Sequence, residues 1–324
     1  MLKIVFAGTS EFAVPSLCAL VASEHDVLTV ITQPDRPSGR GGKLQMTPVK
    51  EAALAHGLLV LQPEKISEPE FVTSLKELGS VDAMVVVAYG QKIPSDILRW
   101  PKFGVINVHG SLLPKYRGAA PIQHALIAGE KTTGVTTMLI DEGWDTGPIL
   151  LQREVEILPD ENAGELSQRL AEVGAQLLLE TLAGLEQGTI NPVSQDHSLA
   201  TYAPSLKSNA GLIDWSASAE AIINLVRGCT PKPGAFTSRN GLLLKVWRAR
   251  AEEVDASLGS PGEIMAVDKD GIVVAAGQGM VRLLEVQPAS RRKMSAAEYA
   301  LGARLKPGDR FDLTVEAAQT NEQG

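Results

Sequence analysis

Short apolar runs alternate with helical stretches along the first 110 residues of the chain. The runs Leu2 to Ala7, Val27 to Thr32 and Ala83 to Ala88 are apolar enough to be buried strands. Pro48 to His56 and Glu68 to Leu78, which lie between them, are expected to be helices. Strands and helices that alternate at this spacing predict an open, mostly parallel α/β sheet covered on both faces. Ligands of such sheets bind beyond the carboxyl ends of the strands.

The next strand-like run, Ile106 to His109, carries two polar side chains near its end. Asn107 and His109 lie two residues apart, so they share one face of a strand, and the backbone then bends at Gly110. A carboxamide can hold a developing oxyanion and an imidazole can move a proton, which makes the pair a candidate acyl-transfer site. The alternative is an asparagine that caps the turn and a hydrogen-bonded core histidine. This run alone leaves the two interpretations equal.

An acidic loop, Asp141 to Pro148, follows another strand-like run, Gly134 to Ile140. Its glycines allow a carboxylate to turn toward a neighbouring strand end. We favour Asp145 over Asp141 because Asp145 lies between the two glycines. A carboxylate beside His109 would orient the ring and stabilise its cationic form. A calcium loop is disfavoured because the ligand spacing and closing glutamate of an EF-hand are missing, while a plain surface turn remains an alternative.

Three motifs resemble those of the folate-dependent formyltransferases. They are Asn107-Val108-His109-Gly110-Ser111-Leu112-Leu113-Pro114, Tyr116-Arg117-Gly118-Ala119-Ala120-Pro121-Ile122-Gln123 and Asp145-Thr146-Gly147. The resemblance runs from Lys3 to about Phe311 and implies a Rossmann-like catalytic domain followed by a small, oligonucleotide-binding-like (OB-like) β-barrel. Two departures are visible: Pro231-Lys232-Pro233, where the family usually has a tryptophan between two prolines, and Ser10, where proline is common. Neither touches the proposed chemistry.

The resemblance also implies a reaction. The formyl donor would be 10-formyltetrahydrofolate, and the acceptor would be the α-amine of methionine on a charged initiator tRNA, which is thereby prepared for translation initiation. Asn107, His109 and Asp145 would be catalytic. A nucleotide-sugar amine as the acceptor, or a nonenzymatic RNA-binding protein, are the alternative functions.

The folate is expected beside the catalytic residues. The resemblance places Ser111, Leu112, Leu113 and Pro114 against it, mainly through backbone groups. Tyr89 and Gly90 end a strand on the same side and are candidates for the pterin pocket. Core packing is the alternative for the two leucines.

The net charge of −8 argues at first against a nucleic-acid partner, but the charge is unevenly distributed. Residues 1–204 hold 15 basic and 24 acidic residues, whereas residues 205–324 hold 15 and 14. Basic patches on an acidic body can bind phosphates locally. By resemblance, the loop Asp35 to Thr47 enters the acceptor-stem region of the tRNA, with Arg40 as the main contact. The candidate tRNA-binding residues are Arg36, Arg40, Lys43, Lys232, Arg239, Lys245 and Arg248, and solvated surface charges are the alternative.

Length and patterning predict two domains. We expect a catalytic domain at 1–189, a linker at 190–208, a β-barrel tRNA-binding domain at 209–314 and a disordered tail at 315–324. Short apolar runs with glycine turns in the second half indicate a β-rich domain, and the barrel itself is implied by the resemblance.

Several other classes of protein are disfavoured. The first turn holds one glycine instead of Gly-x-Gly-x-x-Gly, which argues against a nicotinamide cofactor. The five histidines are scattered without ligand spacing, so no metal site is expected. Cys18 and Cys229 fit reduced thiols in a cytosol. Without a long apolar run or a signal peptide, we expect a cytoplasmic monomer that binds neither DNA nor a membrane.

Overall fold

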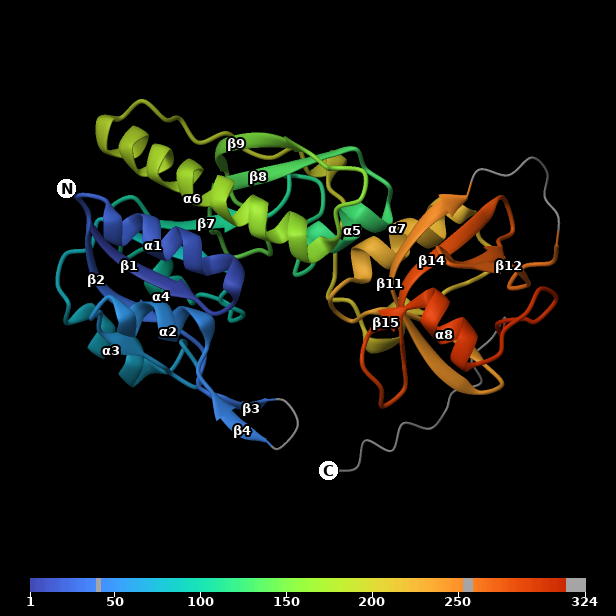
Figure 1. The fold of residues 1–324 in the computed structure, drawn as a ribbon. Helices are drawn as coiled ribbons and strands as arrows, with labels where there is room; N and C mark the ends of the chain where they lie inside the picture. The colour runs from blue at the N-terminus through green and yellow to red at the C-terminus, as the bar shows by residue number, and fades with distance from the viewer. Residues whose placement is uncertain (39–41, 253–258, 313–324) are drawn as a thin grey trace. The chain divides into compact units, whose positions relative to one another are not determined.

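The structure is a computed structural model that describes residues 1–38, 42–252 and 259–312 (Figure 1). The chain forms two compact units. The first comprises Met1–Pro121, Thr132–Glu156 and Leu166–Pro204, and the second comprises Ile122–Lys131, Ile157–Glu165 and Ser205–Gly324. Residues 190–204, most of the expected linker, therefore belong to the first unit. The sequence indicates a linker there because these residues are mostly polar and show no periodic apolar pattern.

A seven-stranded sheet forms the centre of the first unit, in the order β5-β2-β1-β6-β7-β8-β9. The strands are β1 (Lys3–Gly8), β2 (Asp26–Ile31), β5 (Val60–Leu61), β6 (Ala83–Val87), β7 (Val105–His109), β8 (Thr132–Leu139) and β9 (Ile149–Glu156). The five strands from β5 to β7 run parallel, and β8 and β9 are antiparallel to their neighbours. The predicted mostly parallel sheet is confirmed. The strand β9, in which partly buried and exposed residues alternate, is not among the strands that the sequence predicts.

Helices cover both faces of this sheet. They are α1 (Val14–Ala22), α2 (Pro48–Ala55), α3 (Pro69–Lys76), α4 (Ser95–Leu98) and α6 (Ala163–Gln187). One apolar cluster joins α3 and α4 to the sheet face that carries Val5 and Met84. On the other face, α6 comes so close to β7 that a side chain at Gly174 would lie 2.9 Å from Val108. Among the described residues, no helix is both long and apolar enough to cross a membrane.

The segment expected to be a loop contains a short hairpin. β3 (Arg36–Ser38) pairs antiparallel with β4 (Lys43–Gln45). The base of the hairpin is fixed by Asp35, which forms a 2.6 Å ion pair with Lys50 and accepts a 2.7 Å hydrogen bond from Gln62. These contacts lower the pKa of Asp35, the hydrogen bond from Lys50 being the largest cause. The hairpin therefore begins at an anchored point near the carboxyl end of β2.

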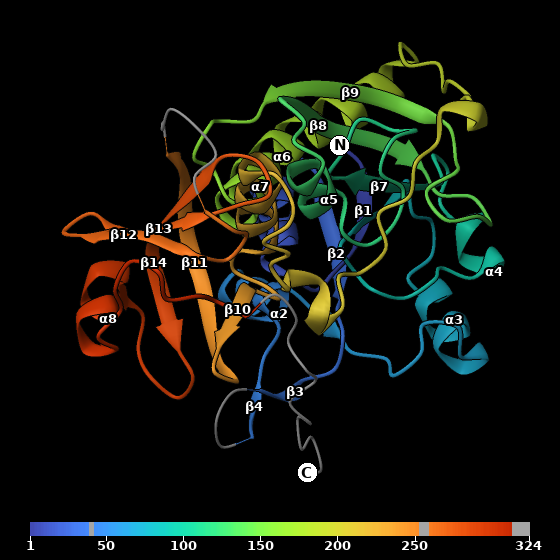
Figure 2. The same ribbon diagram turned by 90° about the vertical axis from the view of Figure 1, so that its right-hand side faces the viewer.

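The second unit is built on an antiparallel sheet, in the order β10-β11-β14-β13-β12 with β15 against β14 (Figure 2). Its strands are β10 (Ala235–Arg239), β11 (Leu242–Glu252), β12 (Ile264–Asp268), β13 (Gly271–Ala275), β14 (Met280–Pro288) and β15 (Met294–Ser295). α5 (Pro121–Ile127), α7 (Ala219–Cys229) and α8 (Ala296–Gly302) complete it. In its core, Trp215 stacks on Phe311 at 5.6 Å between ring centroids. The predicted smaller β-rich domain after the parallel sheet is confirmed.

Candidate active site

The carboxyl end of β7 presents two polar side chains on the same sheet face. Asn107 is half-buried and His109 is 6% exposed. Val108, between them, points to the opposite face and packs against Gly174 of α6. The alternation of a β-strand thus fixes both polar groups on the side away from α6.

The acidic loop brings a carboxylate to this pair. Asp145 Oδ1 accepts a long, 3.4 Å hydrogen bond from Asn107 Nδ2, and Oδ2 lies 3.8 Å from His109 Nδ1. Oδ2 also accepts a 2.8 Å hydrogen bond from the Gly118 N–H. Asp141 instead accepts hydrogen bonds from Gly143 N–H and Thr146 Oγ1 within its own loop. The structure thus brings Asn107, His109 and Asp145 together and leaves Asp141 outside.

Oxygen atoms face both ring nitrogens of His109. Nε2 lies 3.0 Å from the carbonyl oxygen of Tyr116, which can only accept, so Nε2 carries a proton. The Asp145 carboxylate lies 3.8 Å from Nδ1, a separation too long for a hydrogen bond. The ring is therefore held through Nε2, and its Nδ1 faces the Asp145 carboxylate.

The predicted folate turn is already hydrogen-bonded within the protein. Ser111 O accepts from Thr136 Oγ1 at 2.6 Å, and Leu113 O accepts from Gln152 Nε2 at 2.9 Å. Leu113 is 3% exposed, which fits core packing, whereas Leu112 and Pro114 are half-buried. Leu112 and Pro114 are consequently the members of the turn with apolar surface left for a ligand.

At the strand end, Tyr89 makes polar contacts through its main chain, whereas its ring is buried. Tyr89 O accepts hydrogen bonds from Thr9 Oγ1 at 2.9 Å and from Gln33 Nε2 at 3.3 Å. The side chain is 2% exposed in the apolar cluster under α3 and α4, and its hydroxyl has no hydrogen-bond partner within the described parts of the chain. Burial there raises the pKa of Tyr89. Gly90 adopts a φ of 89°, so this edge turns sharply beyond β6.

The basic candidates of the hairpin are only partly described. Arg36 is exposed and forms a 3.4 Å ion pair with the exposed Glu64. Lys43 begins β4, and Arg40 lies outside the described residues.

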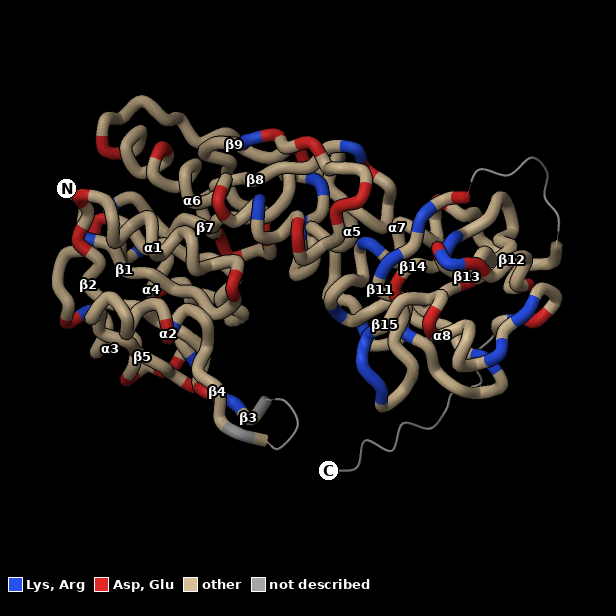
Figure 3. Tube along the Cα trace, in the orientation of Figure 1, with Lys and Arg blue, Asp and Glu red and all other residues tan. Residues whose placement is uncertain are grey.

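Lysines and arginines are found at several places in the second unit, among them β11 and the segment before β15 (Figure 3). The basic candidates of this unit differ in how far acidic side chains neutralise their charge. Arg239 forms a 3.0 Å ion pair with Asp309, with side chains 22% and 19% exposed. Arg248 forms a 3.2 Å ion pair with Glu165, and both of these side chains are more exposed than those of Arg239 and Asp309. Lys232 is exposed, and Lys245 Nζ lies 5.7 Å from the centre of the Trp247 ring.

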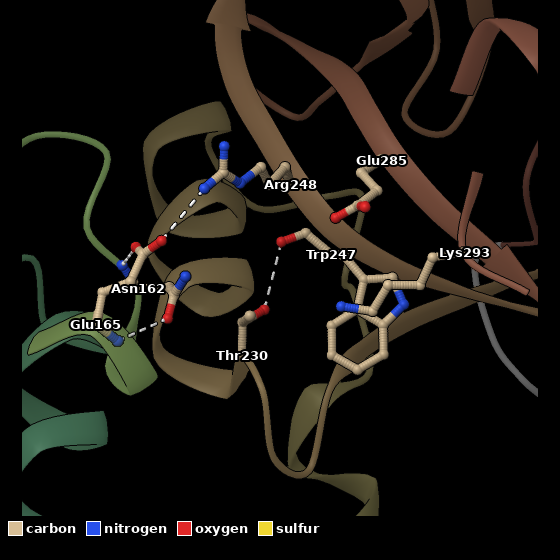
Figure 4. Close-up of a pocket in the computed structure, with 7 residues that line it drawn as sticks. All are labelled: Asn162, Glu165, Thr230, Trp247, Arg248, Glu285 and Lys293. Atoms are coloured by element: carbon tan, nitrogen blue, oxygen red, sulfur yellow. Dashed lines mark hydrogen bonds and ion pairs between the residues drawn. The ribbon is translucent and has the colours of Figure 1, made fainter. Parts of the chain in front are cut away.

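One basic residue missing from the predicted set lies in the same region. Lys293 Nζ lies 3.7 Å above the Trp247 ring, so lysines at 245 and 293 both contact this tryptophan. Figure 4 shows Lys293 along the indole at the edge of a polar pocket. The pocket is lined by Asn162, Glu165, Thr230, Trp247, Arg248, Glu285 and Lys293. The run Arg291-Arg292-Lys293 is the sequence signal that points to it.

Two buried residues near Asp145 have no assigned role from the sequence. Gln195 donates hydrogen bonds to the main chain of the acidic loop, and Arg117 donates to Gln195. Arg117 belongs to a family motif, whereas Gln195 follows a polar stretch and carries no signal. Among the described residues, no group of three or more His, Cys, Asp or Glu side chains is arranged to hold a metal ion.

Comparisons with known proteins agree along nearly the whole chain. The family models "Formyl transferase" and "Formyl transferase, C-terminal domain" match residues 2–182 and 205–304. The methionyl-tRNA formyltransferase of Geobacter metallireducens is 49% identical over 310 residues, which cover 96% of this chain and 98% of the relative.

Solved structures share the fold at low sequence identity. The methionyl-tRNA formyltransferase from Clostridium thermocellum matches with a TM-score of 0.54 and 16% identity, covering 78% of this chain and 94% of that chain. WlaRD, a sugar 3N-formyl transferase, matches with a TM-score of 0.65 and 18% identity, covering 90% and 99%. At such identities the likeness extends to the fold alone.

Proposed function

Because this chain belongs to the formyl transferase family, we propose that it transfers the formyl group of 10-formyltetrahydrofolate to the α-amine of methionine on charged initiator tRNA. This reaction prepares the tRNA for translation initiation. The observation that carries the proposal is the meeting of Asn107, His109 and Asp145 at one strand end. The near full-length similarity to methionyl-tRNA formyltransferases supports the acceptor.

The site residues divide the chemistry of acyl transfer between them. The acceptor amine must be uncharged to attack, and α-amino groups titrate near about 7.7–8.0, so about a tenth to a fifth of it is uncharged at pH 7. Asn107 donates a hydrogen bond to the oxyanion that develops on the formyl oxygen when the amine attacks the formyl carbon. His109 accepts through Nδ1 the proton that the amine loses and returns a proton to N10 of the folate as the bond between N10 and the formyl carbon breaks and tetrahydrofolate leaves. Asp145 orients the ring and stabilises its charged form.

The folate binds beside these residues in our proposal. Leu112 and Pro114 supply apolar surface, while Ser111 and Leu113 keep the turn rigid through their hydrogen bonds to Thr136 and Gln152. Backbone groups at Tyr89 and Gly90 line the pterin, since the Tyr89 ring is buried in the core.

Basic residues of both units bind the tRNA in our proposal. In the hairpin these are Arg36, Arg40 and Lys43. In the second unit, Lys232, Lys245 and Arg248 have charge available for phosphate, and Arg239 has less because Asp309 already pairs with it. We add Lys293, whose ammonium group lies over the Trp247 ring. We further propose that the protein acts as a cytoplasmic monomer, with 1–189 as the catalytic domain and 209–314 as the tRNA-binding domain.

Acceptor competition tests the proposal. Purified protein with 10-formyltetrahydrofolate is assayed against charged initiator tRNA and against nucleotide-linked amino sugars. The proposal expects formylation of the tRNA alone. Turnover of an amino sugar without turnover of the tRNA would replace it with the sugar-modifying activity, which the shared fold of WlaRD makes the second candidate.

A further inference from the structure

The main chain of Asp145 is held in an unusual conformation by a residue fifty positions away. Asp145 has a φ of 52°, in the left-handed region that side chains other than glycine rarely adopt. Gln195 Nε2 donates hydrogen bonds to Asp145 O at 2.9 Å and to Gly147 O at 2.7 Å. One amide nitrogen therefore spans the bend that turns the Asp145 carboxylate toward β7.

A buried arginine fixes the other end of this amide. Arg117 donates to Gln195 Oε1 from Nε at 3.1 Å and from Nη2 at 2.7 Å. Arg117 is 3% exposed and Gln195 is 6% exposed. Arginine offers only donors and the two loop carbonyls only accept, so the amide can take one orientation alone. Of the common side chains, a glutamine has the acceptor and the donors at the right ends for this bridge.

The same arginine also fixes a contact to the carboxylate. The N–H of Gly118, next to Arg117, donates to Asp145 Oδ2 at 2.8 Å. The main chain of Arg117 is itself held between Thr201 O, at 2.8 Å from its N–H, and Ala203 N–H, at 2.7 Å from its carbonyl oxygen. The segment around residues 195–203 thus supports Asp145 from both its main chain and its side chain.

We propose that Gln195 and Arg117 are positioning residues of this active site: their buried bridge holds Asp145 where its carboxylate faces Asn107 and His109. This inference rests on the function proposed above. Gln195 acts through the main chain of Asp145, and Arg117 acts through Gln195. A displacement of about 1 Å at a catalytic group can cost about 10²-fold in rate, so loss of the bridge lowers turnover more than substrate binding.

The variant Gln195→Glu separates the effect of the hydrogen bonds to the loop from the effect of side-chain packing. A glutamate keeps the length of the side chain and still accepts from Arg117, but it cannot donate to the two carbonyls and sets an oxygen against them. In the full-length protein we expect kcat to fall about 10- to 10²-fold, with KM for both substrates within about threefold of wild type. Gln195→Met, of similar length without a donor, is the second variant if glutamate prevents folding.

The control must lose a buried hydrogen bond in the same unit without touching the loop. Thr181→Val does so, because the Thr181 hydroxyl bonds to Thr137 Oγ1 and Leu177 O, each at 2.7 Å, away from Asp145. This variant is expected to lower the Tm while kcat stays near that of wild type. A kcat loss in Gln195→Glu that Thr181→Val reproduces at equal Tm would overturn the positioning role.

A double-variant cycle decides whether Gln195 works through Asp145. In an Asp145→Ala background, adding Gln195→Glu is expected to cause no further loss of kcat, because the group being positioned is gone. Equal losses in both backgrounds, or wild-type kcat for Gln195→Glu alone, would overturn the inference. Failure of the wild-type protein to formylate charged tRNA would instead refute the proposed function.

Discussion

The strand end at Asn107 and the basic surface near Trp247 belong to different units and depend on different physics. At the strand end, the charged and polar groups are buried or half-buried, and hydrogen bonds fix their positions. Around Trp247, Lys245 and Lys293 contact the ring while their charge stays available to solvent or phosphate. A change at the first region should therefore alter the rate of the chemical step, and a change at the second should alter tRNA affinity and its dependence on salt.

The largest expected effect is that of Asn107→Ala. Removal of one oxyanion donor typically costs about 10²–10³ in rate, so kcat should fall by that factor while KM for charged tRNA stays close to wild type. Steady-state kinetics with both substrates measure this, with Asn191→Ala, at an exposed position of the same unit, as the matched control. Near wild-type kcat for Asn107→Ala would remove the asparagine from the chemistry.

Asp145→Asn should come next. The amide keeps the shape of the side chain and can still accept from the Gly118 N–H, but it cannot stabilise a charged His109. We expect kcat to fall about 10²-fold, at the lower end of typical proton-transfer contributions. Asp141→Asn is the matched control, because the Asp141 carboxylate bonds within its own loop. If the two variants lose equal activity, the carboxylate at 145 has no special role.

The same contrast explains what the sequence could predict. Asn107 and His109 are predictable because strand alternation alone places them on one face, and Asp145 because two glycines mark a tight bend. The bridge from Gln195 is not, since it joins residues 50 positions apart through one amide in a stretch without apolar periodicity. Likewise, the sequence does not distinguish Arg239 from Lys245 as a candidate for phosphate binding. Only the folded structure shows that Asp309 forms an ion pair with Arg239.

Lys245→Ala with Lys293→Ala tests the basic surface. Each lost phosphate contact should lower the slope of log affinity against log salt concentration by about 0.7–0.9, and kcat at saturating tRNA should not change. Binding of charged tRNA measured between about 50 and 200 mM salt gives the slope. The exposed pair Lys3→Ala with Lys102→Ala in the first unit removes equal charge elsewhere and is the control. An equal change of slope in the control would mean that net charge, and not this surface, attracts the tRNA.

Arg239→Ala should give the smallest effect on function and thereby separates a fold-stabilising cation from a binding one. Because Asp309 lies 3.0 Å away and both side chains are mostly buried, the charge of the Arg239 guanidinium is already neutralised within the unit. Loss of the guanidinium leaves the Asp309 carboxylate without this partner and should cost about 3 kcal/mol of unfolding free energy, and the tRNA salt slope should stay as in wild type. Denaturant unfolding and the same tRNA titrations measure the two quantities, with Asp309→Ala as the matched partner variant. A lower salt slope for Arg239→Ala at unchanged stability would return Arg239 to the tRNA-binding set, and burial would then be a poor guide to which cations of this unit bind RNA.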